Sequence, residues 1–116
     1  MEAAAMLTRP IPSSGEAMPV IGLGTSQVFD VGADERGRAP LRAVLQAFAD
    51  AGGHIIDTSP MYGRAEAVTG DLVAEAGVRP RVFLATKVWT SGREAGIAQM
   101  RRSAELLKSD VIDLMQ

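Results

Sequence analysis

The 116-residue chain contains no cysteine and a single histidine. The absence of cysteine excludes disulfide bonds, thiolate nucleophiles and cysteine-based zinc or iron–sulfur sites. One histidine cannot build a metal centre from several imidazoles, so we expect no bound metal.

The sequence also has little net charge and no long apolar run. The formal net charge is −2, and no cluster of lysine and arginine predicts a nucleic-acid partner. The longest uncharged stretch, residues 17–29, is interrupted by glycine and proline and is shorter than the roughly 20 apolar residues that a membrane helix needs. The first residues lack the basic start and apolar core of a secretory signal. We therefore expect a soluble, cytoplasmic protein with no membrane partner.

What the chain does contain is a regular alternation of apolar patterns, in a composition typical of one globular domain. Turn residues between prolines predict a small hairpin over residues 7–19. Short apolar runs predict four strands, at residues 20–25, 55–57, 82–87 and 111–115. Apolar residues at helical spacing predict three helices, from Pro40 to about residue 51, over residues 65–76 and over residues 97–107. Residues 26–39 show no period and are expected to form a loop.

Strands that alternate with helices predict an α/β fold with right-handed crossovers and a parallel sheet. In such folds the active site forms at the carboxyl ends of the strands. Three polar positions fall there: Gly24–Thr25, Asp57 and Lys87. Because side chains alternate along a strand, Asp57 shares a face with Ile55, and Lys87 shares a face with Ala85. A carboxylate and an ammonium group are therefore expected to meet at this edge.

Tyr62 follows Asp57 by five residues, in the loop before the second helix. A phenol is a poor acid at neutral pH, and a neighbouring ammonium group favours its ionised form. An aspartate would keep Lys87 charged and oriented. This combination suits proton donation to a carbonyl oxygen while hydride is delivered to the carbon.

Three motifs carry a family resemblance: GLGT at residues 22–25, GGHIIDTSPMYG at residues 52–63 and FLATKVW at residues 83–89. They resemble the aldo/keto reductases, and the similarity extends over essentially the whole chain. The resemblance implies a (β/α)8 TIM barrel that uses NADPH to reduce aldehydes and ketones. It assigns catalytic roles to Asp57, Tyr62 and Lys87, with Tyr62 as the general acid. Residues 1–116 would form the N-terminal half of that barrel, with the hairpin, about four parallel strands and three helices.

The same resemblance implies the binding residues. Gly24, Thr25 and Asp57 would lie near the nicotinamide end of NADPH, and Tyr62 and Trp89 would contact the small carbonyl substrate. The family's catalytic histidine would come two residues after Gln116, and its later strands hold most of the cofactor. We therefore expect the isolated 116-residue chain to be inactive.

Structural interpretations compete with these roles at several positions. Thr25 could cap the strand-to-loop turn, and Trp89 could cover a loop. His54 is expected to be structural, because it precedes Asp57 by three residues and so lies on the opposite face of the strand. The Gly22-x-Gly24 pair is not a Rossmann fingerprint, because Gln27 stands where that motif needs a further glycine.

Two other functions remain open from the sequence. The chain could be a non-catalytic half barrel that acts only through self-association or with a partner chain. Its apolar outer strands, residues 20–23 and 111–115, would offer open sheet edges for such pairing. It could also be a different barrel enzyme that shares only the architecture, in which case Tyr62 and Lys87 would match by coincidence.

Overall fold

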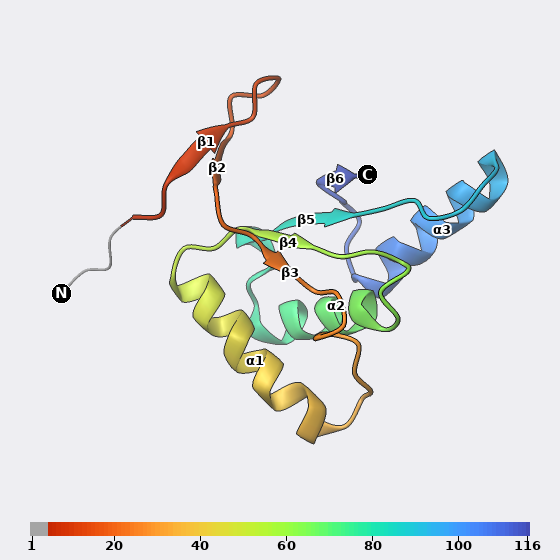
Figure 1. Ribbon diagram of the computed structural model, residues 1–116, viewed down its shortest axis with the longest axis horizontal. Coiled ribbons are helices and arrows are strands. Elements are labelled where there is room, and N and C mark those ends of the chain that lie inside the picture. Colours follow the sequence, from red (N-terminus) through yellow and green to blue (C-terminus); the bar gives the residue numbers. More distant parts are fainter. Residues whose placement is uncertain (1–4) are drawn as a thin grey trace.

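The computed structural model describes residues 5–116, and its centre is a parallel sheet of four strands (Figure 1). These strands lie side by side in chain order: β3 (Leu23–Gly24), β4 (Ile55–Asp57), β5 (Phe83–Thr86) and β6 (Leu114–Met115). In register, Asp57 lies opposite Ala85, and Gly24 lies opposite Asp57. The carboxyl ends of β3, β4 and β5 therefore meet at one edge.

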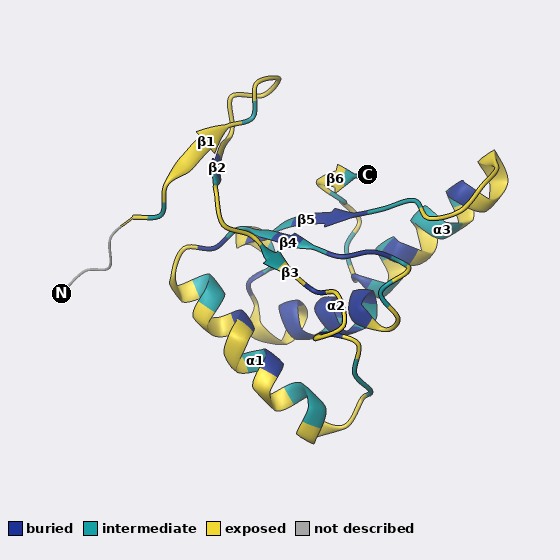
Figure 2. Cartoon of the chain, viewed as in Figure 1, coloured by how far each residue is buried: buried dark blue, intermediate teal, exposed yellow. Residues whose placement is uncertain are grey.

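A separate hairpin precedes the sheet. Strands β1 (Thr8–Pro10) and β2 (Ala17–Pro19) pair in antiparallel fashion, as the turn chemistry predicts. The hairpin projects away from the helices (Figure 1). It is largely exposed, whereas the helix α2 is buried along most of its length (Figure 2).

Three α-helices alternate with the strands: α1 (Glu35–Asp50), α2 (Ala65–Ala76) and α3 (Arg93–Leu106). A short 3-10 helix, η1 (Arg79–Arg81), leads into β5. Helices α1 and α2 pack against the same face of the sheet, and α3 packs against α2 (Figure 1). The predicted α/β fold, with a hairpin, four parallel strands and three helices, is confirmed.

The core lies between the sheet and its helices. Alternation along the strands sends Ile56 and Leu84 into it, and neither exposes more than 1% of its surface. The helices contribute apolar residues at helical spacing, among them Leu41, Leu45, Val68 and Leu72. The alternate residues, including Asp57 and Lys87, are thereby placed on the other face, where functional groups can gather.

The first helix begins earlier than predicted. It starts at Glu35, so Pro40 lies inside it and the expected loop over residues 26–39 is wrong in its last part. The start is set by Asp34, whose carboxylate accepts a hydrogen bond of 3.0 Å from the Gly37 N–H and caps the helix. Pro40 is exposed, where water can satisfy the carbonyl group that its missing N–H leaves free.

The two outer strands are shorter than predicted. β3 and β6 each pair over two residues, although the apolar runs began at Val20 and Val111. Both valines are exposed, because they precede the point at which each outer strand joins its neighbour. Within residues 5–116 no helix is long and apolar enough to cross a bilayer.

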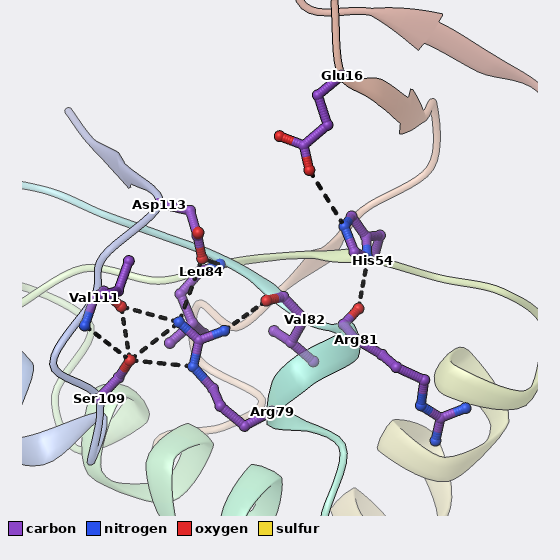
Figure 3. A network of polar contacts seen from close by, with 9 residues as sticks. All are labelled: Glu16, His54, Arg79, Arg81, Val82, Leu84, Ser109, Val111 and Asp113. Carbon is purple, nitrogen blue, oxygen red and sulfur yellow. Dashed lines mark hydrogen bonds and ion pairs between the residues drawn. The ribbon is translucent and has the colours of Figure 1, made fainter. Parts of the chain in front are cut away.

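A polar network ties together the amino end of the sheet (Figure 3). The Arg79 guanidinium donates to the carbonyl oxygens of Val82 (2.6 Å) and Val111 (2.9 Å) and to the Ser109 hydroxyl (3.0 and 3.1 Å). Asp113 accepts from the Leu84 N–H at 2.8 Å. These bonds join η1 and β5 to the segment that leads into β6.

His54 belongs to this same amino end. Its Nδ1 lies 2.5 Å from the Arg81 carbonyl oxygen, and its Nε2 lies 4.0 Å from the Glu16 carboxylate in the hairpin (Figure 3). This position agrees with the structural role predicted for it, because Asp57 lies at the opposite end of β4.

Candidate active site

The candidate site is built on the carboxyl ends of β4 and β5. Asp57 ends β4, and Lys87 directly follows β5. The Lys87 ammonium group lies 3.1 Å from Asp57 Oδ1 and 3.0 Å from Oδ2, and it donates to the Thr58 carbonyl oxygen at 2.8 Å. An ammonium group has three protons to donate, so these acceptors hold it in place. The Lys87 side chain is only 21% exposed, unlike a freely solvated surface lysine.

Tyr62 lies beside this ion pair. The Lys87 nitrogen sits 5.0 Å from the centroid of the Tyr62 ring, which is a cation–π contact. The ring is partly buried against the core. The Tyr62 N–H donates to the Ser59 carbonyl oxygen at 3.1 Å, within the turn that joins β4 to α2. The structure thus brings together the three residues that the sequence singled out, while their catalytic roles stay predictions.

The two candidate cofactor residues of β3 lie in different environments. Gly24 is exposed, and a Cβ atom built on it would meet no atom within 4 Å. Thr25 is fully buried, and its hydroxyl donates a hydrogen bond of 2.9 Å to the Asp57 carbonyl oxygen. Gly24 therefore leaves open space at the edge, whereas Thr25 ties the end of β3 to the end of β4.

The remaining predicted residue, Trp89, lies in the loop after β5. Its side chain is 59% exposed. The loop itself is fixed by Gln99, whose side chain accepts from the Trp89 N–H at 2.5 Å and donates to its carbonyl oxygen at 3.2 Å. The indole therefore covers little of the core formed by residues 5–116.

A sequence profile of the aldo/keto reductase family matches residues 20–116, which include every one of these side chains. The chain belongs to the aldo/keto reductase family. It is 36% identical over 117 residues to an aldo-keto reductase of Mycolicibacterium vanbaalenii, covering 98% of this chain and 39% of that protein. It is also 36% identical over 114 residues to the methylglyoxal reductase YeaE of Escherichia coli, covering 94% of this chain and 38% of that protein.

Solved structures agree with this membership. An aldo-keto reductase from Klebsiella pneumoniae in complex with NADPH superposes with a TM-score of 0.77 at 31% identity, over 95% of this chain and 39% of that one. Another from the same organism, in complex with NADP and acetate, gives a TM-score of 0.74 at 33% identity, over 87% and 35%. This aldo/keto reductase chain thus spans about two fifths of the length of the curated relatives it matches.

One residue of this aldo/keto reductase site was missed by the sequence reasoning. The Gln116 side-chain amide donates to Asp57 Oδ1 at 2.8 Å, so that oxygen accepts from both Gln116 and Lys87. Its backbone N–H also donates to the Thr86 carbonyl oxygen at 2.9 Å. The rule that selected Asp57 and Lys87 applies equally to Gln116, because it follows the last predicted strand.

A second missed contact lies beneath the site. The hydroxyl of Thr86, the residue before Lys87, donates a hydrogen bond of 2.8 Å to the Glu66 carboxylate in α2. Glu66 is only 3% exposed, so its carboxyl group is held inside the protein. The helical pattern of residues 65–76 does not indicate that this glutamate faces inward.

Proposed function

We propose that this chain carries the catalytic residues of an NADPH-dependent reductase that converts aldehydes and ketones to alcohols. The observation that supports it most directly is the position of the Lys87 ammonium group, which pairs with Asp57 and lies 5.0 Å from the centre of the Tyr62 ring. On this proposal, residues 1–116 are the N-terminal half of the barrel.

The edge of the sheet has room for a nicotinamide cofactor. Space above Gly24 is open, and the Asp57 carboxylate lies on the strand next to it. These two residues would contact the cofactor, and Thr25 would support Asp57 from below through its hydroxyl group. When bound, the cofactor supplies the hydride. The NADP and NADPH complexes of the Klebsiella pneumoniae relatives support this choice of cofactor.

Tyr62 is the proposed proton donor to the carbonyl oxygen of the substrate. The positively charged Lys87 ammonium group lies beside the ring of this residue. Asp57 holds Lys87 through both carboxylate oxygens, and the Thr58 carbonyl oxygen accepts a further proton of the same group. The lysine is thereby held beside the Tyr62 ring, where its positive charge can act on the phenol as it donates a proton.

The proposed substrates are small carbonyl compounds, with Trp89 as one wall of their pocket. An exposed indole beside the site offers an apolar surface to an aldehyde or ketone. The name of one relative, methylglyoxal reductase, supports a small aldehyde as the first compound to test.

Titration with NADPH of the complete barrel that contains residues 1–116, followed by the fluorescence of the cofactor, tests the proposal. We expect saturable binding that Gly24→Val weakens at least tenfold, because the new side chain would occupy the open space beside the end of β3, where a Cβ atom meets nothing within 4 Å. Ala33→Val, at an exposed alanine in the following loop, is the matched control and should leave binding unchanged. Absence of saturable binding to the folded barrel would contradict the proposal.

Carbonyl reduction in the same samples tests the role of Tyr62. We expect Tyr62→Phe to abolish turnover while NADPH binding stays within about twofold, because the substitution removes only the hydroxyl group. Loss of binding together with turnover would show that Tyr62 is structural.

A second candidate function is self-association of half barrels without catalysis. Large apolar side chains are exposed next to both outer strands of the described sheet: Ile21 (61%), Val111 (59%) and Leu114 (46%). Exposed apolar groups beside an open strand edge favour pairing with another chain. Size-exclusion chromatography separates the candidates, because a defined dimer that binds no NADPH would favour this second function.

A further inference from the structure

The turn that carries Tyr62 is fastened by a residue from a different loop. The carboxylate of Asp30, which lies between β3 and α1, accepts a hydrogen bond of 2.9 Å from the Arg64 N–H. Arg64 is the N-cap residue directly before α2, and its own side chain makes no capping bond there. Asp30 therefore caps α2 from 34 positions earlier in the sequence.

Gly63 makes this contact possible. Its φ is +60°, a conformation that residues with a side chain rarely adopt. A Cβ atom at this position would lie 2.4 Å from the Asp30 carboxyl carbon and from both of its oxygens. A side chain at position 63 and the carboxylate at position 30 therefore exclude each other.

The core holds Asp30 in place through its neighbour. Phe29 is 1% exposed and belongs to the core, and its N–H donates to the Thr25 carbonyl oxygen at 3.3 Å. The loop is thus anchored one residue before Asp30. Because this loop is anchored, the Asp30 carboxylate can hold the Arg64 N–H in a fixed position.

Tyr62 lies directly before the fastened residues. Its carbonyl oxygen accepts from the Ala65 N–H at 3.1 Å, so the first turn of α2 and the tyrosine backbone are joined. Asp30, Gly63 and Tyr62 also line one hollow of ≈ 270 Å³ at the edge of the sheet. We propose that Asp30 is a positioning residue for Tyr62. By capping α2 and packing closely against Gly63, Asp30 sets the Tyr62 ring beneath the Lys87 ammonium group.

The inference rests on the proposed function only in taking Tyr62 as a proton donor, and the position of the ring can be measured without turnover. The chain has one tyrosine, so 3-fluorotyrosine places a single fluorine on that ring. Its 19F resonance reports the surroundings of Tyr62 alone, and the difference between the folded and the urea-unfolded chain sets the scale.

We expect Asp30→Ala to reduce this folded-minus-unfolded shift difference at least twofold. Asp30→Asn should retain most of it, because the amide oxygen still accepts from the Arg64 N–H. Asp34→Ala is the matched control, since it removes a carboxylate cap from α1 instead of α2. It should leave the resonance in place even if it lowers the melting temperature equally.

Gly63→Ala gives an independent test, because its new methyl group would displace the Asp30 carboxylate. We expect it to change the resonance as Asp30→Ala does, and we expect the double variant to change it little further. Equal effects of Asp30→Ala and Asp34→Ala, or full additivity with Gly63→Ala, would overturn the inference. If Asp30→Ala fails to fold by circular dichroism, Asp30→Asn decides: a resonance that keeps its wild-type position supports the positioning role, and a folded Asp30→Asn chain whose resonance moves to the unfolded position overturns it.

The two proposals fail in different ways. If the complete barrel binds no NADPH while residues 1–116 show the expected fluorine shifts, the proposed function is wrong and the positioning role of Asp30 stands. If the complete barrel binds NADPH while the fluorine resonance does not respond to Asp30→Ala, the proposed function stands and the positioning role is wrong.

Discussion

The carboxylate of Glu66 accepts a hydrogen bond of 2.8 Å from the hydroxyl group of Thr86, and both side chains are buried. This bond joins α2 to β5 directly below Lys87. A carboxyl group withdrawn from water needs such a partner, because leaving a buried polar group without a hydrogen bond is costly. The contact therefore stabilises the packing of α2 against β5, the strand that ends directly before Lys87.

Thr86→Val should destabilise the protein by about 2 kcal/mol, because it leaves the Glu66 carboxylate without its hydroxyl donor at nearly the same volume. Thr86→Ser keeps the hydroxyl group and should cost less. Urea unfolding followed by circular dichroism measures both variants. Equal stability of the two would show that the bond contributes little.

Gly70→Ala should cost about 3 kcal/mol by overpacking. A Cβ atom at this position in α2 would lie 2.1 Å from the Leu106 carbonyl oxygen at the end of α3, so the two helices would have to separate. Gly96→Ala is the matched control in α3, where a Cβ atom would make an ordinary van der Waals contact of 3.6 Å with Val88 Cγ1. It should stabilise the chain by about 0.5 kcal/mol, because alanine favours a helix over glycine. Thermal melting of both variants checks the opposite signs.

Asp71 should make stability depend on acid. Burial alone would raise the pKa of Asp71, but hydrogen bonds from Arg38 (2.7 Å) and Lys108 (2.9 Å) outweigh it and hold the pKa below its ordinary value. The folded state therefore binds this proton less readily than the unfolded state does. Its contribution is complete above the unfolded pKa of about 4 and is lost as the pH falls through the lower folded value.

Asp71→Asn should consequently lower the free energy of unfolding by about 1 kcal/mol at pH 7. On acidification below pH 4, the free energy of unfolding of this variant should fall less than that of the wild type. Urea unfolding at pH 7 and at pH 3 measures this difference. Asp50→Asn is the control, because the Asp50 carboxylate bonds to the neutral amide of Gln46. A wild type and an Asp71→Asn variant with parallel pH profiles would contradict the assignment.

Thr25→Val should destabilise the fold by about 1 kcal/mol, since its hydroxyl bonds the Asp57 carbonyl oxygen in a fully buried position. Thr25→Ser should retain that bond. If Thr25 only supports the strand ends, NADPH affinity of the folded variants changes less than twofold. A large loss of affinity at unchanged stability would instead indicate direct contact with the cofactor.

The sequence predicted the bounds of the central elements more accurately than those of the outer strands and the start of α1. Strand β4 and helix α2 matched their expected bounds, because apolar patterns there are flanked by glycine and proline signals. Helix α1 began earlier because a single capping carboxylate, Asp34, outweighed the proline at position 40. The outer strands shortened because pairing depends on a neighbour, and an apolar run does not show where that neighbour begins.

For the candidate site, the sequence predicted which side chains would meet but not which residues hold them in place. The alternation of side chains was enough to place Asp57 and Lys87 on one face, and register then brought them to 3.0 Å. Glu66 and Asp30 were missed because each acts across a tertiary contact, on Thr86 and on Arg64. Spacing along the chain carries no signal for such contacts.

The four strands of the sheet lie in the order in which they occur along the chain. During synthesis, each strand of this described sheet after β3 therefore finds one of its neighbours already made. Nascent β4 can dock on β3 while the residues of β6 are still being translated. The described sheet can therefore form during synthesis, one strand and one helix at a time, from the amino end onward.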